Sequence, residues 1–496
     1  MVKQSNGFKK WLSPYIYLSG NWLSRIGVVL VTTGAILWLF LLPVILRGFT
    51  DNPYAGILTF MGLPAVFFGG LILIPVGIIF RARRERHRGI YPANFPPLDF
   101  KNTELRRLLF FVGVTTVVNL VIGAQLVYSG VNYMDSVTFC GETCHTVMQP
   151  EYVAYEHSPH ARVACVQCHI GPGASWFVRY KLAGAYQVYA TLLNIYPRPI
   201  PVPVTSLRPA RVTCEQCHWP ARFEGNRLVI IPQYADDEMN TLTKTVLLMH
   251  IGGGDGLGGI HGAHVSPGIT IRYGSDPSRQ KMHWVEYTDT RTGKNELFVD
   301  QKTNPKTVNP ADGRVMDCID CHNQPTHIFH LPGEAMNDAM ANGKISPALP
   351  FVKKEGLALL EAKYTSQSEA AQKISAGLTQ FYSQKYPQVF AQRRAEVSQA
   401  VKGLIAIYDE NVFPKMKVTW GTYPNNLGHM NFPGCFRCHG ALHEASDQSK
   451  MIPQNCDLCH NILSMGEANP KILTDLGLST ATRDPQISDQ SRASSN

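Results

Sequence analysis

Three long runs of apolar residues stand near the N-terminus, ahead of every cysteine in the chain. They cover roughly residues 26–46, 55–80 and 108–128, and none of them contains Asp, Glu, Lys or Arg. Each is long enough to cross a hydrocarbon core of roughly 30 Å as an α-helix. Three such runs in succession favour a membrane anchor over buried helices of a soluble domain or a cleaved signal peptide. The pattern therefore predicts three N-terminal transmembrane helices.

The polar and apolar positions farther along the chain follow two other patterns. Short alternating runs at 227–231, 269–273 and 282–287 predict strands, with a hairpin turn at 292–294. Residues 352–410 have helical periodicity broken at Pro387, and we expect them to cover cofactors. The glycine-rich stretch 251–260 lacks the GK[ST] of a phosphate-binding loop and is interpreted as a flexible connector. A polar tail starts at about residue 480.

The excess of positive charge lies in the N-terminal part of the chain. Residues 1–127 hold 13 basic and 4 acidic residues, a net charge of +9, whereas the remaining 33 basic and 33 acidic residues cancel. Basic residues cluster before the first apolar run and between the second and third, so the positive-inside rule places both segments in the cytoplasm. The chain after residue 128 then lies on the outer side of the membrane, opposite to the cytoplasm. Because the excess charge belongs to the anchor, nucleic-acid binding is not supported.

All twelve cysteines occur in six pairs, and histidine directly follows the second cysteine of each pair. C-x-x-C-H is the pattern for covalent haem c attachment, with the histidine as one axial iron ligand. Zinc sites and disulfides give no reason for a histidine after every pair. Since 17 of 496 residues are histidine, six chance placements have a probability on the order of one in a billion. We therefore predict six haem c groups on Cys140/Cys144/His145, Cys165/Cys168/His169, Cys214/Cys217/His218, Cys318/Cys321/His322, Cys435/Cys438/His439 and Cys456/Cys459/His460.

The first motif differs from the others because three residues separate Cys140 from Cys144. A bulge would allow both thioethers to form; the alternative is a single thioether. A haem is expected there in either case.

Each iron needs an occupant for its second axial position. Met148, three residues after His145, is the candidate for the first haem. Of the histidines outside the motifs, those close to a motif are favoured, and one of the two in the Gly-Ile-His-Gly-Ala-His segment is expected to bind iron. The candidates are His160, His261, His264, His327, His429 and His443.

The segments 139–150 and 158–170 resemble the NapC/NirT family of membrane-anchored multihaem cytochromes. The longer pattern around 318–327 and 432–439 is similar to a larger subgroup, the inner-membrane cytochrome H type of electroactive bacteria. The resemblance implies a protein that oxidises membrane quinols and passes electrons to periplasmic reductases or carriers. This chain departs from the usual family member in having three predicted spans and six motifs instead of one anchor helix and four haems.

The resemblance also implies a quinol site near the first haem. The family's lysine and acidic residue fall on Lys181 and Gln187, so the lysine is kept and the carboxylate is replaced. An amide can hydrogen-bond a quinol hydroxyl but cannot accept its proton as a base. Asp135, Glu142 or a haem propionate are the alternatives for that role.

The expected fold is a membrane-anchored multihaem cytochrome c, with three N-terminal transmembrane helices and an irregular, mainly α haem-packed domain carrying a small β insertion. Its function is interpreted as quinol oxidation at the bacterial inner membrane with electron delivery to a periplasmic partner. Two alternatives stay open: an electron-transfer subunit of a larger respiratory complex, and a catalytic multihaem reductase. The expected segments are 1–25 (cytoplasmic), 26–128 (anchor, with basic loop 81–107), 129–220 (three haems), 221–317 (β insertion), 318–350 (fourth haem), 351–412 (helical), 413–479 (two haems) and 480–496 (tail).

Overall fold

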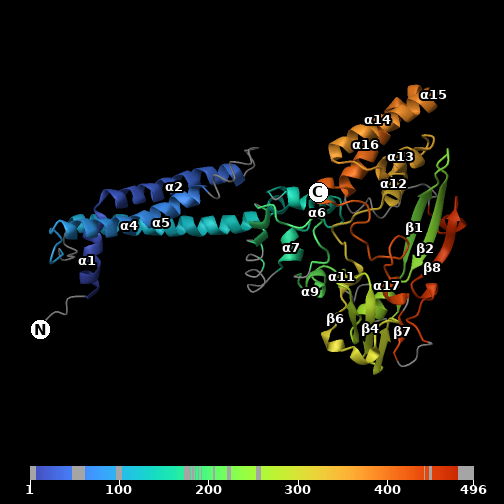
Figure 1. Ribbon diagram of the computed structural model, residues 1–496, viewed down its shortest axis with the longest axis horizontal. Helices are drawn as coiled ribbons and strands as arrows, with labels where there is room; N and C mark the ends of the chain where they lie inside the picture. The colour runs from blue at the N-terminus through green and yellow to red at the C-terminus, as the bar shows by residue number, and fades with distance from the viewer. Residues whose placement is uncertain are drawn as a thin grey trace. The chain divides into compact units, whose positions relative to one another are not determined.

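A computed structural model of the chain divides it into two compact units, residues 1–134 and 135–496 (Figure 1). The structure describes residues 7–46, 62–95, 103–143, 145–171, 180, 184, 186–187, 189–191, 193–204, 207–219, 225–252, 258–440, 442–445 and 450–478. The expected tail at 480–496 lies outside this described part.

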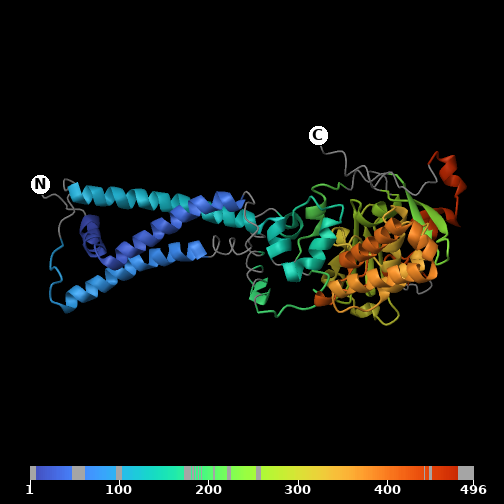
Figure 2. The same cartoon turned by 90° about the horizontal axis from the view of Figure 1, so that it is seen from above.

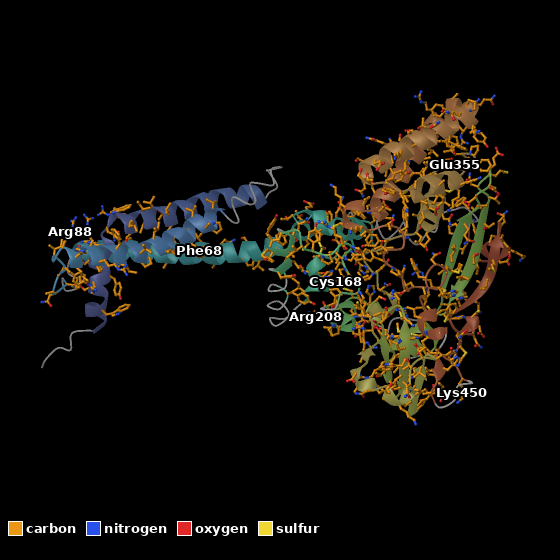
Figure 3. The ribbon with its side chains drawn as sticks, in the orientation of Figure 1. Phe68, Arg88, Cys168, Arg208, Glu355 and Lys450 are labelled. Carbon is orange, nitrogen blue, oxygen red and sulfur yellow. The ribbon has the colours of Figure 1, made fainter. Side chains whose placement is uncertain are left out.

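The described secondary structure of the N-terminal unit consists of helices, joined by short non-helical segments such as 88–95 (Figure 2). Helices α2 (Trp22–Leu46) and α5 (Thr103–Met134) contain the first and third predicted spans, and α1 (Gly7–Ser19) precedes them. Helix α4 (Leu63–His87) contains most of the second predicted span and continues beyond it through a basic segment. Within the described residues, α4 is the one helix that is long and apolar enough to cross a membrane. Phe68 and Arg88 mark its apolar part and its basic end (Figure 3).

Helices α2 and α4 pack closely because glycines face each other where they cross. A Cβ atom on Gly27 would lie 2.7 Å from the carbonyl oxygen of Gly70, and one on Gly70 would lie 2.8 Å from that of Gly27. The Ser24 hydroxyl donates a hydrogen bond of 3.0 Å to the carbonyl of Ile74 on the facing helix. Small residues that allow such a backbone approach are typical of helix pairs in membranes.

Two antiparallel sheets lie in the second unit. One has the strand order β1 (Arg227–Tyr234), β2 (Leu242–Met249), β8 (His460–Glu467). The other has the order β6 (Arg314–Val315), β3 (Ile269–Ser275), β4 (Met282–Asp289), β5 (Lys294–Val299), β7 (His443–Glu444). The β4–β5 hairpin turns at Gly293, whose φ of 71° suits glycine. Both sheets therefore take an edge strand from the C-terminal part of the chain, beyond the predicted β insertion.

The helical segment forms a hydrophobic core of its own. It comprises α12 (Pro332–Ala341), α13 (Val352–Glu361), α14 (Gln367–Lys385), α15 (Pro387–Gln392) and α16 (Arg394–Asn411). Pro387 starts a new helix, as a residue without an N–H can at a first helical position. Buried side chains from four of the helices meet Tyr234 of β1. The segment therefore packs as a module with its own core, and its role as a cofactor cover stays a prediction.

Candidate functional site

The cysteine motifs lie on single helical turns. They start in α7 (Cys165–His169), α11 (Cys318–Cys321) and α17 (Phe436–His439), at the end of α9 (Ala210–Cys214), and in the 3-10 turn η7 (Cys456–Leu458). One backbone hydrogen bond closes each turn, for example 2.8 Å from His322 N to Cys318 O and 2.8 Å from His218 N to Cys214 O. A single turn therefore brings two sulfurs and an imidazole to neighbouring positions on one helix.

The first motif accommodates its extra residue as a π-helical turn, η2 (Phe139–Thr143). A π turn holds one residue more than an α turn, so the bulge expected between Cys140 and Cys144 takes this form. Gly141 is needed inside it, because a Cβ atom there would lie 2.1 Å from the ring of Tyr152. Cys144 and the side chain of His145 lie outside the described residues.

The described cysteines do not support the zinc or disulfide alternatives. None of the eleven described cysteines forms a disulfide bond. Among the described residues, no three His, Cys, Asp or Glu side chains gather in a way that could hold a metal ion. The sulfurs are thus available for bonds to an external group.

Five motif histidines each face a second imidazole. The ring centroids are 6.3 Å apart for His169 and His327, 6.0 Å for His218 and His160, and 6.3 Å for His322 and His261. They are 6.0 Å apart for His439 and His264, and 6.2 Å for His460 and His429.

These separations match two imidazoles on opposite sides of one metal ion. A metal–imidazole bond is about 2.0–2.1 Å long and the ring centroid lies about 1.1 Å farther out, which together give about 6.3 Å between centroids. A direct hydrogen bond between two ring nitrogens would bring the centroids closer, to about 5 Å. The five pairs therefore fit six-coordinate iron with two histidine ligands.

Hydrogen bonds at Nδ1 leave Nε2 of several of these rings available to a metal. Nδ1 lies 2.8 Å from the Glu151 carbonyl in His327 and 2.9 Å from the Pro325 carbonyl in His160. It lies 2.7 Å from the Ile260 carbonyl in His264 and 2.6 Å from the Pro453 carbonyl in His439. Metal-bound histidines commonly donate their other N–H to a carbonyl in this way, which fixes the tautomer.

Burial also favours the neutral, metal-binding form of the imidazoles. It lowers the pKa of His327 to about 4, with a further contribution from His169. Burial likewise lowers the pKa of His169, His261, His264 and His322. A neutral imidazole is the form that coordinates a metal.

Four of the five second histidines face a motif that is not next to them in sequence; the exception is His261, which faces the fourth motif, the next one along the chain. His327 closely follows the fourth motif but faces the second, and His160 precedes the second but faces the third. His429 precedes the fifth motif but faces the sixth. The partner is therefore supplied from another segment.

The helix α10 (Gly259–Val265) supplies two of the partners. His261 and His264 were expected to provide one ligand between them, but they face His322 and His439 respectively. His443 was also expected to serve a haem. It lies in β7, where its backbone pairs with Val299, and the positions opposite His439 and His460 are taken by His264 and His429.

The six motifs neighbour one another in chain order. The side chains of Cys140 and Cys165 share a hydrogen bond, as do those of Cys214 and Cys318. Burial raises the pKa of Cys168, and the charges of Cys165 and Cys217 raise it further.

The same order continues through motifs four, five and six. The pKa of Cys321 is raised by burial and then by its neighbour Cys435. The pKa of Cys459 is raised by burial and then by the same Cys435. Each motif thus lies near the next one along the chain.

The residues predicted around the first motif are only partly described. Met148 is half-buried on α6 (His145–Glu156) and packs with Val147, Phe413 and Met416, so its role as a ligand stays a prediction. Lys181 lies outside the described residues. Gln187 is exposed, and its carbonyl accepts a hydrogen bond of 2.8 Å from Thr191. Of the alternative proton acceptors, Glu142 accepts a hydrogen bond of 3.3 Å from Tyr152.

Two acidic residues near the motifs were missed by the sequence analysis. Burial raises the pKa of Glu151 on α6 to about 7. Asp320, inside the fourth motif, is a buried carboxylate that accepts several hydrogen bonds. The sequence marks Glu151 only as an acidic residue within a mainly apolar helical segment. Nothing in the sequence distinguishes Asp320.

Comparison with known proteins gives two matches. The model described as NapC/NirT cytochrome c family, N-terminal region, matches residues 102–199 and so includes the first two motifs. The chain is 39% identical over 468 residues to the cytochrome c-type protein ImcH of Geobacter sulfurreducens, which covers 91% of this chain and 90% of that protein. No solved structure matches the chain.

Proposed function

Because this chain belongs to the NapC/NirT cytochrome c family, whose members are typically membrane-anchored, we propose that it is a membrane-bound hexahaem cytochrome. It takes electrons from the quinol pool and passes them to a periplasmic carrier or reductase. The observation that carries the proposal is the set of five imidazole pairs, each with centroids 6.0–6.3 Å apart, at attachment motifs that each lie near the next one along the chain.

The residues present fit haem c. The cysteines provide thioether attachment and the motif histidines provide one axial ligand each. When bound, haem iron supplies one-electron redox chemistry. The protein contributes attachment, axial ligation and the environment that tunes each site. The second ligands are assigned, from the first motif to the sixth, to Met148, His327, His160, His261, His264 and His429.

The paired imidazoles support a relay more than a reductase. A catalytic site would need an open coordination position for substrate on one of the irons. At motifs four, five and six, His261, His264 and His429 stand at that position. We therefore propose that motifs four, five and six conduct electrons and carry out no substrate chemistry.

Membrane attachment is assigned to α2, α4 and α5. Apolar side chains of α4 and α5 face outward, including Ile72, which is 63% exposed, and Phe110, which is 75% exposed. Such surfaces suit contact with lipid. The basic end of α4, from Arg81 to Arg88, is assigned to the cytoplasmic side, and residues after 128 to the periplasmic side.

Quinol oxidation is assigned to the neighbourhood of the first motif, which follows α5 closely in sequence. Lys181 and Gln187 are proposed to contact the quinol. Because Gln187 cannot act as a base, the quinol protons are proposed to leave through a neighbouring acidic group such as Asp135 or Glu142.

The test is reduction of the purified full-length protein by a reduced quinol analogue, followed in the haem absorption bands. The pyridine haemochrome assay should give six haem c per chain. Quinol should reduce the wild-type protein, and Lys181→Ala should slow this reduction while leaving reduction by dithionite unchanged. Wild-type protein that dithionite reduces and quinol does not would contradict the quinol assignment.

A second function is an electron-transfer subunit of a larger respiratory complex without its own quinol site. The outward-facing apolar side chains of α4 and α5 would suit contact with partner subunits as well as with lipid. Mild-detergent purification separates the two functions. A complex that is reduced by quinol, whose isolated hexahaem chain is not, would favour the subunit.

A further inference from the structure

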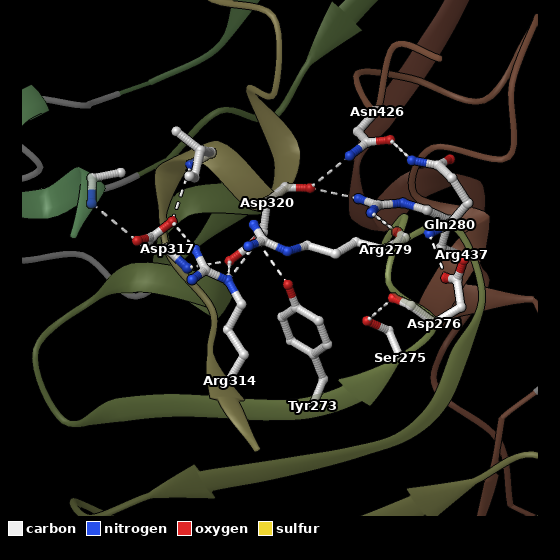
Figure 4. Close-up of polar contacts among 12 residues, drawn as sticks. Tyr273, Ser275, Asp276, Arg279, Gln280, Arg314, Asp317, Asp320, Asn426 and Arg437 are labelled. Carbon is white, nitrogen blue, oxygen red and sulfur yellow. Dashed lines mark hydrogen bonds and ion pairs between the residues drawn. The ribbon is translucent and has the colours of Figure 1, made fainter. Parts of the chain in front are cut away.

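Asp320 stands between the two cysteines of the fourth motif and is almost completely buried, with 3% of its surface exposed. Its carboxylate accepts hydrogen bonds of 2.7 Å from the Tyr273 hydroxyl, 3.0 Å from Arg314 Nε and 3.3 Å from Arg279 Nη1 (Figure 4). A buried carboxylate is costly unless it is paired and hydrogen-bonded in this way. The C-x-x-C-H pattern does not specify the residue at this position. Here that residue, Asp320, anchors the fourth motif to the five-stranded sheet.

Arg437 links this anchor to the fifth motif, in which it occupies the equivalent position. Its Nη2 donates a hydrogen bond of 2.6 Å to the Asp320 carbonyl, and its Nη1 donates one of 2.7 Å to the Arg279 carbonyl. Asn426 Nδ2 also donates to the Asp320 carbonyl, at 3.2 Å. The planar guanidinium spans two carbonyls at once, which an ammonium group cannot do with the same geometry.

Asp317 links the anchor to the third motif. Its carboxylate accepts hydrogen bonds of 3.0 Å from the backbone N–H of Ala210 and 3.1 Å from Arg314 Nη2. Ala210 is the first residue of α9, the helix that ends at Cys214. Asp317 also caps α11, where Ile319 N donates to it at 3.2 Å. Arg314 thus joins the two carboxylates and, through them, two motif helices.

The same residues border a cavity. It has a volume of about 670 Å³ and is lined by Arg279, Arg314, Asp317 and Ile319 together with His264 and Arg208. His264, the proposed second ligand at the fifth motif, therefore shares this cavity with the two arginines and Asp317. Substitution of the arginines or of Asp317 would change the surroundings of His264.

We infer that Arg279, Arg314, Asp317, Asp320 and Arg437 form a motif bridge that holds the third, fourth and fifth motifs in one fixed arrangement. These are positioning residues: they act through the motif backbones and leave the axial ligands to the histidines. The inference deepens the proposed relay and rests on it, because a relay depends on fixed spacing between successive sites. The inference adds that side chains inside and beside the attachment motifs fix the spacing of the third, fourth and fifth motifs.

The test compares Arg437→Gln and Arg437→Lys with Asp289→Asn in the full haem-loaded protein. Asp289 pairs with Arg291 at 2.9 Å on the same five-stranded sheet and contacts no attachment motif in the described contacts, so its variant controls for loss of an ion pair there. Three properties are measured: haem content, the electron paramagnetic resonance spectrum, and electron equilibration after photochemical reduction. No quinol is used, so failure of the bridge and failure of quinol oxidation are distinguishable.

Arg437→Gln should keep six haems, alter the spectral signals of two of them and slow equilibration about tenfold, which is within the range for loss of a supporting residue at a metal site. Arg437→Lys should lie between the wild type and Arg437→Gln, and Asp289→Asn should match the wild type. Hydrogen exchange of residues 208–216 and 317–323 should rise in the Arg437 variants alone, and this readout applies even if Arg437→Gln loses haem. Spectra, rates and exchange indistinguishable from those of Asp289→Asn would overturn the inference.

Discussion

The helical module of α12–α16 and the motif helices are stabilised in opposite ways. In the module, Met336, Ile374, Leu378 and Leu404 are completely buried against one another. In contrast, the residues of α7 and α17 are at most partly buried. The module has an aliphatic core, whereas the motif helices leave between them the space that covalently attached cofactors would fill. The difference teaches that one chain can contain a self-sufficient core beside a region whose core is its cofactor.

The comparison would be tested most strongly by removing the cofactor. We expect full-length protein produced without haem attachment to lose amide protection in α7, α10 and α17 while keeping it in α14 and α16. The physical reason is that α7 and α17 have no completely buried side chain, whereas α14 and α16 share a hydrophobic core. Hydrogen exchange with mass spectrometry measures both regions in one sample. Equal protection of α7 and α16 without haem would contradict the comparison.

Removal of one axial ligand should disturb the motif region locally. His327→Ala is expected to convert one haem of the six from low spin to high spin, because the position opposite His169 becomes open. The electron paramagnetic resonance spectrum measures this change of spin state. His443→Ala is the matched control and should leave all signals unchanged; a new high-spin signal in that variant would contradict the assignment of ligands.

A cavity in the module should lower stability without changing the cofactors. Leu404→Ala removes a completely buried side chain and is expected to lower the free energy of unfolding by about 3 kcal/mol. Unfolding by urea, followed by far-UV circular dichroism, measures the loss. The exposed neighbour Lys402 provides the control variant Lys402→Ala, which should be nearly neutral. Altered haem spectra in Leu404→Ala would show that the two regions are not independent.

The smallest expected effect concerns pH and the ion pair at Asp289. The hydrogen bond with Arg291 lowers the pKa of Asp289 from 3.8 to about 2. A carboxylate with a lowered pKa stabilises the fold above the unfolded value and loses this contribution as pH falls through the folded value. We therefore expect wild type to exceed Asp289→Asn in unfolding temperature at pH 5, with the gap closing between about pH 4 and pH 2. A gap that stays constant over this range would exclude the ion pair as its source.

Much of the candidate site could be predicted because its chemistry is local. A motif such as Cys318–Cys321 with His322 occupies one helical turn, so the separation of its residues in the sequence determines their separation in the structure. The helices at the predicted membrane segments, the β4–β5 hairpin turn and the helix break at Pro387 are also encoded within a few residues. Hydrophobic periodicity and turn chemistry act over such distances and need no knowledge of the fold.

The sequence by itself determined where the cysteine pairs lie, which histidine follows each pair and where apolar helices lie. Only the tertiary structure decided that His327 faces His169, that α10 supplies two imidazoles and that His264 and His429, not His443, face His439 and His460. It also decided that Asp320 and Arg437 meet, and that β7 and β8 complete sheets begun far earlier in the chain. The reason is physical: these are contacts between segments far apart in sequence, and their geometry is set by how the whole domain packs, which residue type and spacing do not encode.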